Sequence, residues 1–464
     1  MHTILTIARS APDVPAPTRL SCDAASSLGI TLDDLPRRDR ALLPLDLAPG
    51  SLTVLTGPSG SGKSTLRADM HRAFVESHLP MPASVVDPAN LRPGSRCCLE
   101  LLGGRARSVE RALDRLARVG LADASAITAR ASTLSDGQRE RLLLALAMQR
   151  AERLARNTPV LLSIDELGAR VDEPCARAIA RCIRRWLEER RDLNIRAVIT
   201  SHRSAAIAQL RPAKIVRLSA LGEAQITSDT RAPESFESIY SISTGTRADL
   251  AALSALHYRP GAPATIAKVL RCTERATGEL VGVLALSLPT LNGRWRALAW
   301  PGRYQTGDRR DDAQRLTAEV RCISRVIVAP AHRSMGVARC LIEAYLASPL
   351  TARTEAVSAM GRISPIFERA GMTAHDLPPA ARHQRLLDAF EHVGIARWRL
   401  AQPSTLEPRL HALPIADHQF LRTELSLWSG ASRATRRYTD APLSTQLHIA
   451  CRTISARPVA YTHG

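Results

Sequence analysis

The stretch Gly57-Pro58-Ser59-Gly60-Ser61-Gly62-Lys63-Ser64-Thr65 follows an apolar run at 52–56 and precedes a helical pattern at 66–76. Closely spaced glycines let successive backbone N–H groups turn toward one anion, as in loops that hold phosphates. A lysine at the end of such a loop reaches the outer phosphates, and the following serine can bind Mg²⁺. We therefore predict a nucleoside triphosphate site whose contact residues are Gly57, Ser59, Gly60, Gly62, Lys63, Ser64 and Thr65.

The composition bounds the number of domains and the kind of partner. The chain has 464 residues, and its 63 Lys and Arg against 44 Asp and Glu give a formal net charge of +19. This length exceeds what one hydrophobic core usually holds, so two or three domains are expected. The charge favours a nucleic acid as partner. Codon bias is an alternative explanation for the use of arginine in place of lysine, because lysine occurs only at Lys63, Lys214 and Lys268.

Cysteine usage and hydropathy predict the compartment. The nine cysteines are scattered without a Cys-x-x-Cys pair, which is typical of reduced thiols. No early segment has the form of a signal peptide, and no apolar run approaches the roughly twenty residues of a membrane span. We expect a soluble, cytoplasmic protein without a membrane partner.

Three further motifs follow the phosphate-binding loop. Leu134-Ser135-Asp136-Gly137-Gln138 precedes a helical pattern rich in Leu and Ala. A buried-strand pattern at 160–164 ends in Asp165 and Glu166, a pair suited to Mg²⁺ binding and water activation, although an ordinary strand-end turn explains it equally well. A third strand pattern ends in His202, which taken alone is more often a structural histidine.

In this order the motifs resemble an ATP-binding-cassette (ABC) ATPase, and the resemblance spans the first half of the chain. It implies that Ser135, Gly137 and Gln138 form the signature, which contacts ATP together with the phosphate-binding loop. It further implies Ser64 and Asp165 as Mg²⁺ ligands, Glu166 as the catalytic carboxylate, Asp172 as the D-loop residue and His202 as the switch histidine. Because cassettes of this family close in pairs around two nucleotides, the implied partner is a second copy when ATP is bound.

The sequence departs from the pattern of transport cassettes. Asp136 stands where transporters usually have glycine, and no glutamine lies between Thr65 and Gln138, so that Asp87 is the candidate for the Q-loop position. No aromatic residue between Gly29 and Gly57 is available to stack on the base. Without a membrane span, these departures favour a soluble cassette of the DNA-repair-like or regulatory sort.

The second half of the chain begins after a polar, Pro-containing segment at 228–235. Two apolar segments, 266–272 and 280–288, flank a turn and predict a hairpin. A strand pattern at 323–328 then leads through Ala331-His332-Arg333-Ser334-Met335-Gly336-Val337-Ala338 into a helix. Free N–H groups at the start of such a helix suit a pyrophosphate.

The spacing of Arg333, Gly336 and Ala338 after this strand resembles motif A of the GNAT superfamily of N-acetyltransferases. The resemblance implies that acetyl-CoA or another acyl-CoA is held by Val328, Arg333, Ser334, Gly336, Val337 and Ala338. Phe367-Glu368-Arg369-Ala370-Gly371-Met372 is similar to a later family motif but lacks the tyrosine that often acts as general acid. A short similarity to phage Mom-type DNA modification enzymes implies His257 and Tyr258 near the active site. A helix C-terminus with a local hydrogen bond explains that pair equally well.

The expected fold class is α/β, with an N-terminal ABC-type P-loop ATPase domain (1–228) and a C-terminal GNAT-like acyltransferase domain (229–400). A basic extension (401–464) with one helix at 417–429 follows, and its segment 433–438 suits either nucleic-acid contact or a solvated loop. The leading hypothesis is an ATP-hydrolysing cassette coupled to an N-acyltransferase that modifies a nucleobase in DNA or RNA. The alternatives are an acyltransferase on a protein or small-molecule amine, and a regulatory ATPase whose second half binds CoA or nucleic acid without catalysis.

Overall fold

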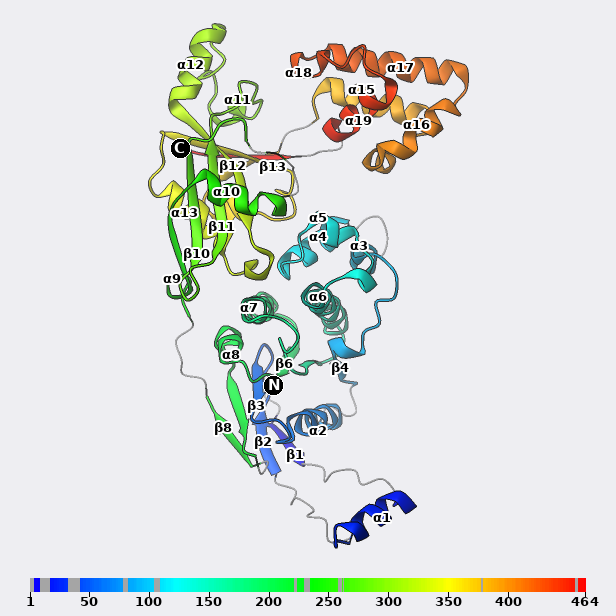
Figure 1. Ribbon diagram of the computed structural model, residues 1–464, viewed down its shortest axis with the longest axis vertical. Helices are drawn as coiled ribbons and strands as arrows, with labels where there is room; N and C mark the ends of the chain where they lie inside the picture. The colour runs from blue at the N-terminus through cyan, green and yellow to red at the C-terminus, as the bar shows by residue number, and fades with distance from the viewer. Residues whose placement is uncertain are drawn as a thin grey trace. The chain divides into compact units, whose positions relative to one another are not determined.

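The computed structural model describes most of the chain (Figure 1). The described residues are 4–8, 17–31, 42–77, 82–103, 109–220, 223–228, 234–257, 261, 263–376, 379–454 and 458–464. They fall into two compact units, and the first consists of Met1–Ala262, Leu270–Val283 and Ile327–Leu341. The second consists of Pro263–Val269, Leu284–Val326 and Ile342–Gly464. None of the described helices has the length and apolar character that crossing a bilayer requires.

A six-stranded sheet forms the centre of the N-terminal region, in the order β4-β5-β6-β3-β7-β8. Its strands are β3 (Leu52–Thr56), β4 (Ser84–Val86), β5 (Val160–Ile164), β6 (Ile195–Thr200), β7 (Lys214–Leu218) and β8 (Ala224–Thr227). All neighbours are parallel except β7 and β8. Parallel strands are covered on both faces and therefore read as continuous apolar runs, which is why β3 and β5 were predictable, and both are confirmed.

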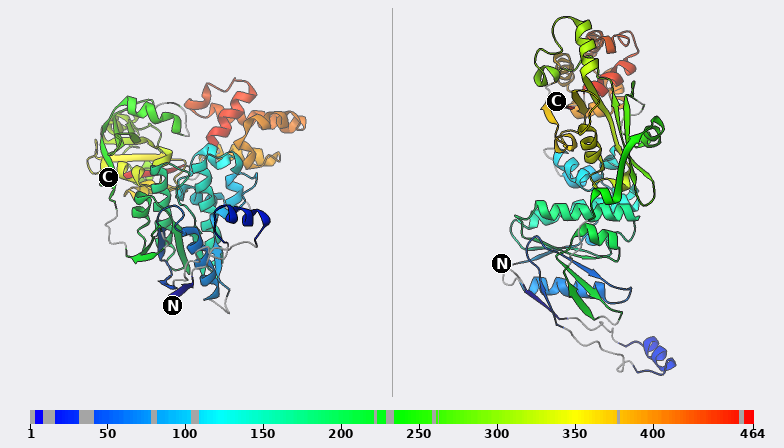
Figure 2. Two further views of the ribbon diagram at one scale, coloured as in Figure 1. Left: turned by 60° about the horizontal axis from the view of Figure 1, so that its bottom comes forward. Right: turned by 90° about the vertical axis from the view of Figure 1, so that its left-hand side faces the viewer.

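Helices cover both faces of this sheet (Figure 2). On one face, Leu55 and Leu161 pack with Leu66 and Phe74 of α2 (Lys63–Glu76). The other face carries a larger core built with α3 (Cys98–Gly103), α4 (Val109–Arg118), α5 (Ala124–Thr128), α6 (Asp136–Leu154), α7 (Glu173–Glu189) and α8 (Ser204–Leu210). The alternation of β-strand side chains assigns adjacent residues to opposite cores. The ends of β3 and β5 are thereby fixed between two packed layers.

The sequence of residues 1–50 predicts short strands and turns, with an opening strand at 1–8, and the structure differs from this in part. β1 (Ile4–Ala8) pairs antiparallel with β2 (Leu42–Asp46), as expected for an opening strand. Arg19–Ser27, however, forms the helix α1, which the prediction missed. Thr18 and Ser21 close a reciprocal capping box at its start, and the usual signal for such a box is Glu or Gln rather than Ser at the third helical position.

A seven-stranded sheet follows, in the order β14-β15-β13-β12-β11-β10-β9. Its strands are β9 (Tyr240–Gly245), β10 (Lys268–Glu274), β11 (Leu280–Ser287), β12 (Val320–Val328), β13 (Arg353–Ser358), β14 (Thr373–Asp376) and β15 (Val459–His463). The predicted hairpin is confirmed as β10 and β11. β12 and β13 are parallel, and their pairing runs from Val320↔Arg353 to Ile323↔Ala356, although β12 continues to Val328. The two strands therefore stop pairing partway along β12.

The helices of the second half connect and flank this sheet (Figure 1). They are α9 (Phe236–Ile239), α10 (Arg247–Leu253), α11 (Arg296–Ala299), α12 (Arg309–Glu319), α13 (Val337–Leu346) and α14 (Ile366–Arg369). The sequence predicts that Thr246 caps a helix at 247–256, and Thr246 does cap α10 through its side chain. The predicted helix after the 323–328 strand is confirmed as α13.

The region predicted as a basic extension, 401–464, is not a separate tail. A helical group lies between β14 and β15 in the chain, formed by α15 (Ala381–His392), α16 (Pro403–His411), α17 (Ile415–Gly430), α18 (Arg433–Arg436) and α19 (Leu443–Ile454). It has its own core, which includes Phe390, Leu425 and Trp428. β15 then pairs antiparallel with both β13 and β14. The boundary at 401 therefore cuts through the helical group, whereas residues 459–463 belong inside the sheet.

Candidate nucleotide-binding site

The predicted phosphate-binding loop lies between β3 and α2. Gly57, Gly60 and Gly62 all have positive φ, at 150°, 77° and 88°, a region that glycine reaches without steric cost. A Cβ on Gly57 would lie 2.5 Å from the backbone oxygen of Leu218. Lys63 folds back over the loop, with Nζ donating to the carbonyls of Gly57 at 2.9 Å and Pro58 at 2.8 Å. The lysine ammonium thus lies over the concave side of the loop.

The end of β5 brings Asp165 and Glu166 to this loop. Ser64 Oγ donates to Asp165 Oδ2 at 3.1 Å, so the two oxygens predicted to bind Mg²⁺ are neighbours. Thr200, at the end of β6, donates through Oγ1 to Asp165 Oδ1 at 2.6 Å and accepts from the Glu166 N–H at 2.6 Å. Hard cations prefer such hydroxyl and carboxylate oxygens, and the pair of Ser64 and Asp165 fits Mg²⁺. Glu166 itself is exposed and has a φ of 49°, unusual for a residue with a side chain.

Arg67 is a component of the site that sequence reasoning missed. From the second turn of α2, its guanidinium pairs with Asp87 at 2.7 Å and with Asp165 at 3.2 Å. It therefore links the ends of β4 and β5. Asp87, the candidate for the Q-loop position, also caps the short helix that follows it by accepting from Ala89 N–H at 2.8 Å. In the sequence, Arg67 is only an arginine four residues after Lys63. Its role cannot be inferred until the strand order shows that Asp87 and Asp165 are neighbours.

His71 adds a polar contact to the strand that precedes Asp165. Its Nε2 lies 2.6 Å from Ser163 Oγ in β5, which Asp165 directly follows. Burial lowers the pKa of His71, and the neighbouring Arg67 cation lowers it further. The imidazole is thus held neutral beside Arg67 rather than adding a second positive charge.

The signature residues begin α6. Ser135 is its N-cap, with Oγ accepting from Gln138 N–H at 3.4 Å while Gln138 Oε1 accepts from Ser135 N–H at 3.1 Å. Gly137 lies close to the start of α7, since a Cβ there would be 3.4 Å from Val171 and 3.5 Å from Cys175. Asp172 caps α7 by accepting from Cys175 N–H at 2.8 Å. The signature and the predicted D-loop are therefore adjacent.

A cavity of about 330 Å³ opens between the start of α6 and the end of β5. Among its lining residues are Asp136, Arg139, Asp165, Glu166 and Arg170. Glu140 also lines the cavity and accepts from Gly168 N–H at 3.1 Å, and burial raises its pKa. Glu166 thus lines a cavity whose walls carry both acidic and basic side chains. The same cavity includes Asp87.

The other predicted catalytic residues are His202, His257 and Tyr258. His202 is exposed and follows the end of β6. His257 is half-buried after a short helix (Ser254–Leu256), and its N–H donates to the carbonyl of Ser254 at 3.1 Å. Tyr258 lies outside the described residues.

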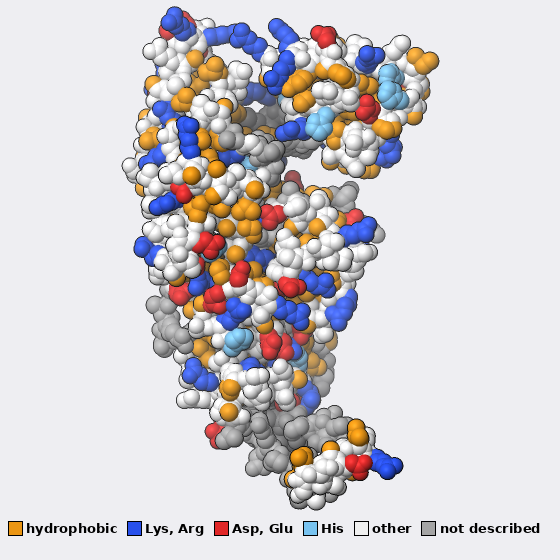
Figure 3. Space-filling view, viewed as in Figure 1, with side chains coloured by type: hydrophobic (Ala, Val, Ile, Leu, Met, Phe, Trp, Pro, Cys, Tyr) orange, Lys and Arg blue, Asp and Glu red, His pale blue; other side chains and the backbone are white. Residues whose placement is uncertain are grey.

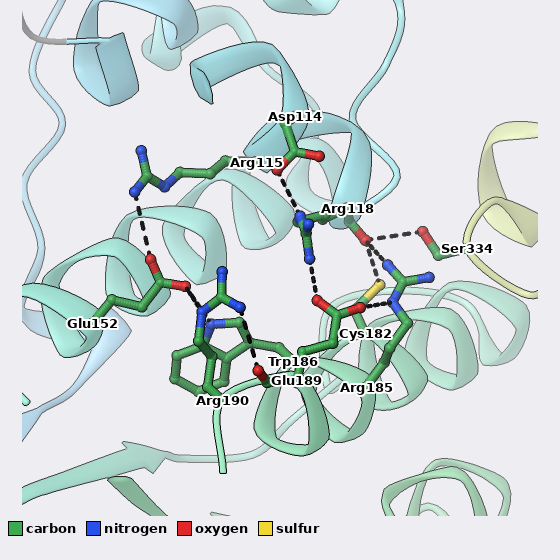
Figure 4. Close-up of polar contacts among 10 residues, drawn as sticks. All are labelled: Asp114, Arg115, Arg118, Glu152, Cys182, Arg185, Trp186, Glu189, Arg190 and Ser334. Atoms are coloured by element: carbon green, nitrogen blue, oxygen red, sulfur yellow. Dashed lines mark hydrogen bonds and ion pairs between the residues drawn. The ribbon is translucent and has the colours of Figure 1, made fainter. Parts of the chain in front are cut away.

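The loop predicted to hold acyl-CoA joins β12 to α13. Val328 ends β12, Ser334 and Gly336 have φ of 70° and 92°, and Val337 begins α13 and is buried, with Ala338 following it half-buried. Within the first compact unit, this loop contacts the helical part of the cassette. Arg333 pairs with Asp123 at 2.6 Å. Figure 4 shows Ser334, whose Oγ donates to the carbonyl of Arg118 at 3.2 Å. Arg333 therefore already has an anionic partner.

Charged side chains on the face shown in Figure 3 are spread out rather than gathered. Lysine and arginine side chains occur over the whole view, and acidic side chains lie among them in its middle part. The excess of arginine therefore does not form a single basic patch on this face.

Comparisons with known proteins agree with the nucleotide site. An AAA domain family model matches residues 19–206. The phosphonates import ATP-binding protein PhnC 2 of Pseudomonas savastanoi pv. phaseolicola is 33% identical over 28% of this chain and 60% of its own length. The chain thus spans less than two thirds of that relative's length. The zinc import ATP-binding protein ZnuC of Ruegeria pomeroyi is 31% identical over 39% of this chain and 68% of its own length.

Among solved structures, the chain is similar to a dimeric ATP-binding cassette in a post-hydrolysis state bound to ADP and Pi. That similarity has 20% identity, a TM-score of 0.30, and covers 40% of this chain and 89% of the other. The residues that the AAA domain family model matches contain the phosphate-binding loop, the signature and the Asp165-Glu166 pair. Through this N-terminal region, the chain belongs to the family of ATP-binding-cassette (ABC) ATPases.

Proposed function

We propose that the chain is an ATP-hydrolysing cassette coupled to an acyl-CoA-dependent N-acyltransferase, and that the transferase acts on a nucleobase. For the ATPase, the arrangement of Ser64, Asp165 and Glu166 carries the proposal. Ser64 and Asp165 would hold Mg²⁺ against the outer phosphates, where the cation neutralises developing charge. Glu166, exposed to the cavity, would orient the attacking water and accept its proton. Lys63 would move from the loop carbonyls to the phosphates.

A homodimer completes this site in the proposal. Ser135 and Asp136 are exposed at the start of α6, so the free N–H groups of that helix can reach a nucleotide held by a second copy. ATP would then bind between the phosphate-binding loop of one copy and the signature of its partner. The pair would alternate between two arrangements, one reached when it closes on ATP and one that follows hydrolysis.

For the transferase, the supporting observation is the early end of the pairing between β12 and β13. Pairing stops at Ile323↔Ala356 while β12 continues to Val328. Unpaired strand backbone offers N–H and C=O groups to an extended ligand that carries amides, as peptide ligands do when they add to a sheet edge. The pantetheine arm of CoA is such a ligand, and the turn at Ser334 to Gly336 would hold its pyrophosphate. The strand order and the parallel pair among antiparallel neighbours also support a GNAT-like domain.

The reaction would be direct transfer. The acceptor nitrogen attacks the thioester carbonyl carbon, the C–N bond forms, and the C–S bond breaks as CoA leaves as a thiolate. The proton that the nitrogen loses passes to solvent, and solvent protonates the thiolate. Positioning of the two substrates would supply most of the acceleration. The net charge of +19 favours a nucleic acid as acceptor, and an amine of a protein or small molecule is the alternative.

The ATPase is tested with Glu166→Gln. Loss of the general base should lower ATP turnover by about 10² to 10⁴ while ATP binding persists, so that the variant elutes as a dimer with Mg-ATP in size exclusion. Glu110→Gln, on the exposed side of α4, is the control and should behave as wild type. A Glu166→Gln protein that binds ATP and stays monomeric would contradict the paired cassette.

The transferase is tested by acetyl-CoA binding and turnover. Gly336→Trp places a bulky side chain in the proposed pyrophosphate turn and should abolish both. Gly278→Trp is the control, because Gly278 has a φ of 73° with no atom within 4 Å of a Cβ and so carries similar backbone strain in the hairpin. Equal acetyl-CoA binding by the two variants would show that the loop is not the cofactor site.

The acceptor is tested separately. Mass analysis of digested nucleosides from cells with and without the gene should reveal an acylated base that depends on it. If the nucleosides are identical while labelled acetyl groups appear on protein or on a small amine, the alternative acceptor is correct. If the purified chain hydrolyses ATP and binds acetyl-CoA without transfer to any of these, the regulatory ATPase is the better assignment.

A further inference from the structure

The signature helix reaches the loop before α13 through one buried cation. Arg141, on α6, is only 4% exposed. Its NH2 group lies 3.3 Å from the carbonyl oxygen of Pro330 and 3.4 Å from that of Ala331, and NH1 donates to Val119 O at 2.9 Å. A buried guanidinium is tolerated only while its donors are satisfied. The carbonyl groups of the loop therefore supply part of the hydrogen bonding that the buried Arg141 guanidinium requires.

Gly120 shows how closely Arg141 on α6 and the loop at 330–336 approach each other. Its φ is 76°, and a Cβ there would lie 2.1 Å from Arg141 NH1. The same Cβ would be 3.2 Å from Arg333 Cβ and 3.2 Å from Ser334 Oγ. A residue without a side chain is thus required where Arg141 and the loop meet.

Two further contacts hold the loop on this side. Arg333 pairs with Asp123, with only 16% and 22% of the two side chains exposed. Ser334 shares the carbonyl of Arg118 with Cys182 and Arg185 of α7 (Figure 4). The loop that would bind a pyrophosphate is therefore restrained by three elements of the cassette, namely α6, α7 and the turn after α4.

We propose that Arg141 is a positioning residue that makes the conformation of the loop at 330–336 depend on the nucleotide state of the cassette. Ser135 and Gln138 begin the same helix that carries Arg141, and Cys175, beside the D-loop residue Asp172, also contacts Arg141 at 3.3 Å. A nucleotide that pulls on the start of α6 thus moves Arg141 relative to Pro330 and Ala331. The inference rests on the proposed cassette.

The direction of the coupling follows from the charges. Asp123 and a pyrophosphate compete for the guanidinium of Arg333, so the contact with Asp123 opposes acyl-CoA binding. ATP-driven closure that disturbs Arg141 frees the loop and lets Arg333 turn to the ligand. By linkage, acyl-CoA must then strengthen ATP binding by the same factor.

Hydrogen exchange of the full chain tests the coupling without assuming any acyl ligand. In the Glu166→Gln protein, Mg-ATP should protect amides of residues 57–65 and should speed exchange at 330–336 by about fivefold. In a protein that also carries Arg141→Met, exchange at 330–336 should be fast already and should not respond to ATP. Unchanged exchange at 330–336 alongside protection at 57–65 would overturn the coupling and leave the cassette intact. Absence of protection at 57–65 would instead refute the cassette on which the coupling rests.

A second variant tests whether the effect of Arg141→Met is only a loss of folding. Gly120→Ala keeps Arg141 but displaces its guanidinium and the loop, so it should give the same ATP-insensitive exchange. Gly94→Ala is the matched control, since Gly94 has a φ of 68° with no atom within 4 Å of a Cβ. If Gly94→Ala changes exchange at 330–336 as much as Gly120→Ala does, the effect is backbone strain and the proposal is wrong.

Discussion

At the scale of single residues, the nucleotide site depends on atoms that have no substitute. Gly57 is the clearest case, because the Leu218 carbonyl occupies the space that a Cβ would need. Thr200 is another, because its one hydroxyl serves both Asp165 and the N–H of Glu166. Motif spacing identified Gly57, whereas Thr200 had no signal beyond ending a strand.

Gly57→Ala should abolish ATP binding and lower the melting temperature. The methyl group would overlap a backbone oxygen at 2.5 Å, so the loop or β7 must move. Gly60→Ala serves as control, because Gly60 has a φ of 77° and an open Cβ position, so it should cost only about 1–2 kcal/mol of backbone strain. Calorimetric ATP binding and thermal unfolding measure both effects. Equal loss of ATP affinity in the two variants would show that strain alone accounts for it.

Thr200→Val should slow hydrolysis more than it weakens binding. The substitution keeps the shape of the buried side chain and removes the hydroxyl that orients Asp165 and Glu166, so we expect a kcat loss of about 10-fold or more, as for loss of one oriented hydrogen bond. Steady-state ATPase assays with a separate ATP titration measure the two quantities. Thr53→Val, buried on β3, is the control and should retain kcat. A Thr200→Val protein with normal kcat would remove this threonine from the mechanism.

At the scale of elements, the sequence predicted those with strong patterns and missed those that tertiary contacts decide. Strands β3 and β5 were predicted from their continuous apolar runs, and helix α17 corresponds to the helix predicted at 417–429. Helix α16 was missed because prolines usually break helices, yet Pro403 occupies its first turn and Pro408 lies inside it. Arg67 could not be assigned, since only the order β4-β5-β6-β3 brings Asp87 and Asp165 together beside it.

The pair of Glu424 on α17 and Arg385 on α15 predicts a pH dependence of the helical group. Arg385 donates to both carboxylate oxygens, at 2.7 and 2.6 Å, and these hydrogen bonds hold the pKa of Glu424 below its ordinary value of 4.5. A carboxyl group whose pKa is lower in the folded protein than in the unfolded chain stabilises the fold at pH values above its unfolded pKa. This stabilisation is lost as the pH falls through the folded pKa. Since Arg385 is 64% exposed, solvent screens the pair, and its contribution to stability is small.

Glu424→Gln should therefore destabilise the protein at pH 7 but not at about pH 3. Urea unfolding across this range measures the difference from wild type. Glu391→Gln, exposed on α15, should show no such pH-dependent difference. A constant difference at every pH would mean that Glu424 acts by packing rather than by charge.

At the scale of the whole molecule, the helical group is an insertion into a sheet. Asp376, at the end of β14, pairs with Val459, at the start of β15, so the chain leaves and re-enters the sheet at adjacent positions. His375 and Thr462 are 87 residues apart, yet their side chains lie 2.8 Å from each other. The sequence predicted a tail here, because a short strand after many helices carries no sign of the strand that it will join.

Replacing residues 377–458 with Asn-Gly should preserve the sheet. Two residues of this type suit a tight hairpin between antiparallel strands, and the helices of the insertion pack mainly on one another among the described residues. Circular dichroism and thermal unfolding should show a folded protein. Removal of residues 458–464 is the contrasting variant and should unfold the sheet, since it exposes β13 and β14. If the excised protein unfolds as the truncated one does, the helical group is required by the sheet.

The position of β15 also sets an order for biosynthesis. A ribosome makes β13 and β14 well before β15, and the strand that belongs between them emerges only after the whole of α15 to α19. The cassette can fold as soon as it leaves the ribosome, because domains generally fold as units during synthesis. The nascent sheet meanwhile has a gap with unpaired edges, which are prone to wrong pairing. Chaperones that shield strand edges would therefore act on this protein between the synthesis of β14 and that of β15, after the nucleotide site is already formed.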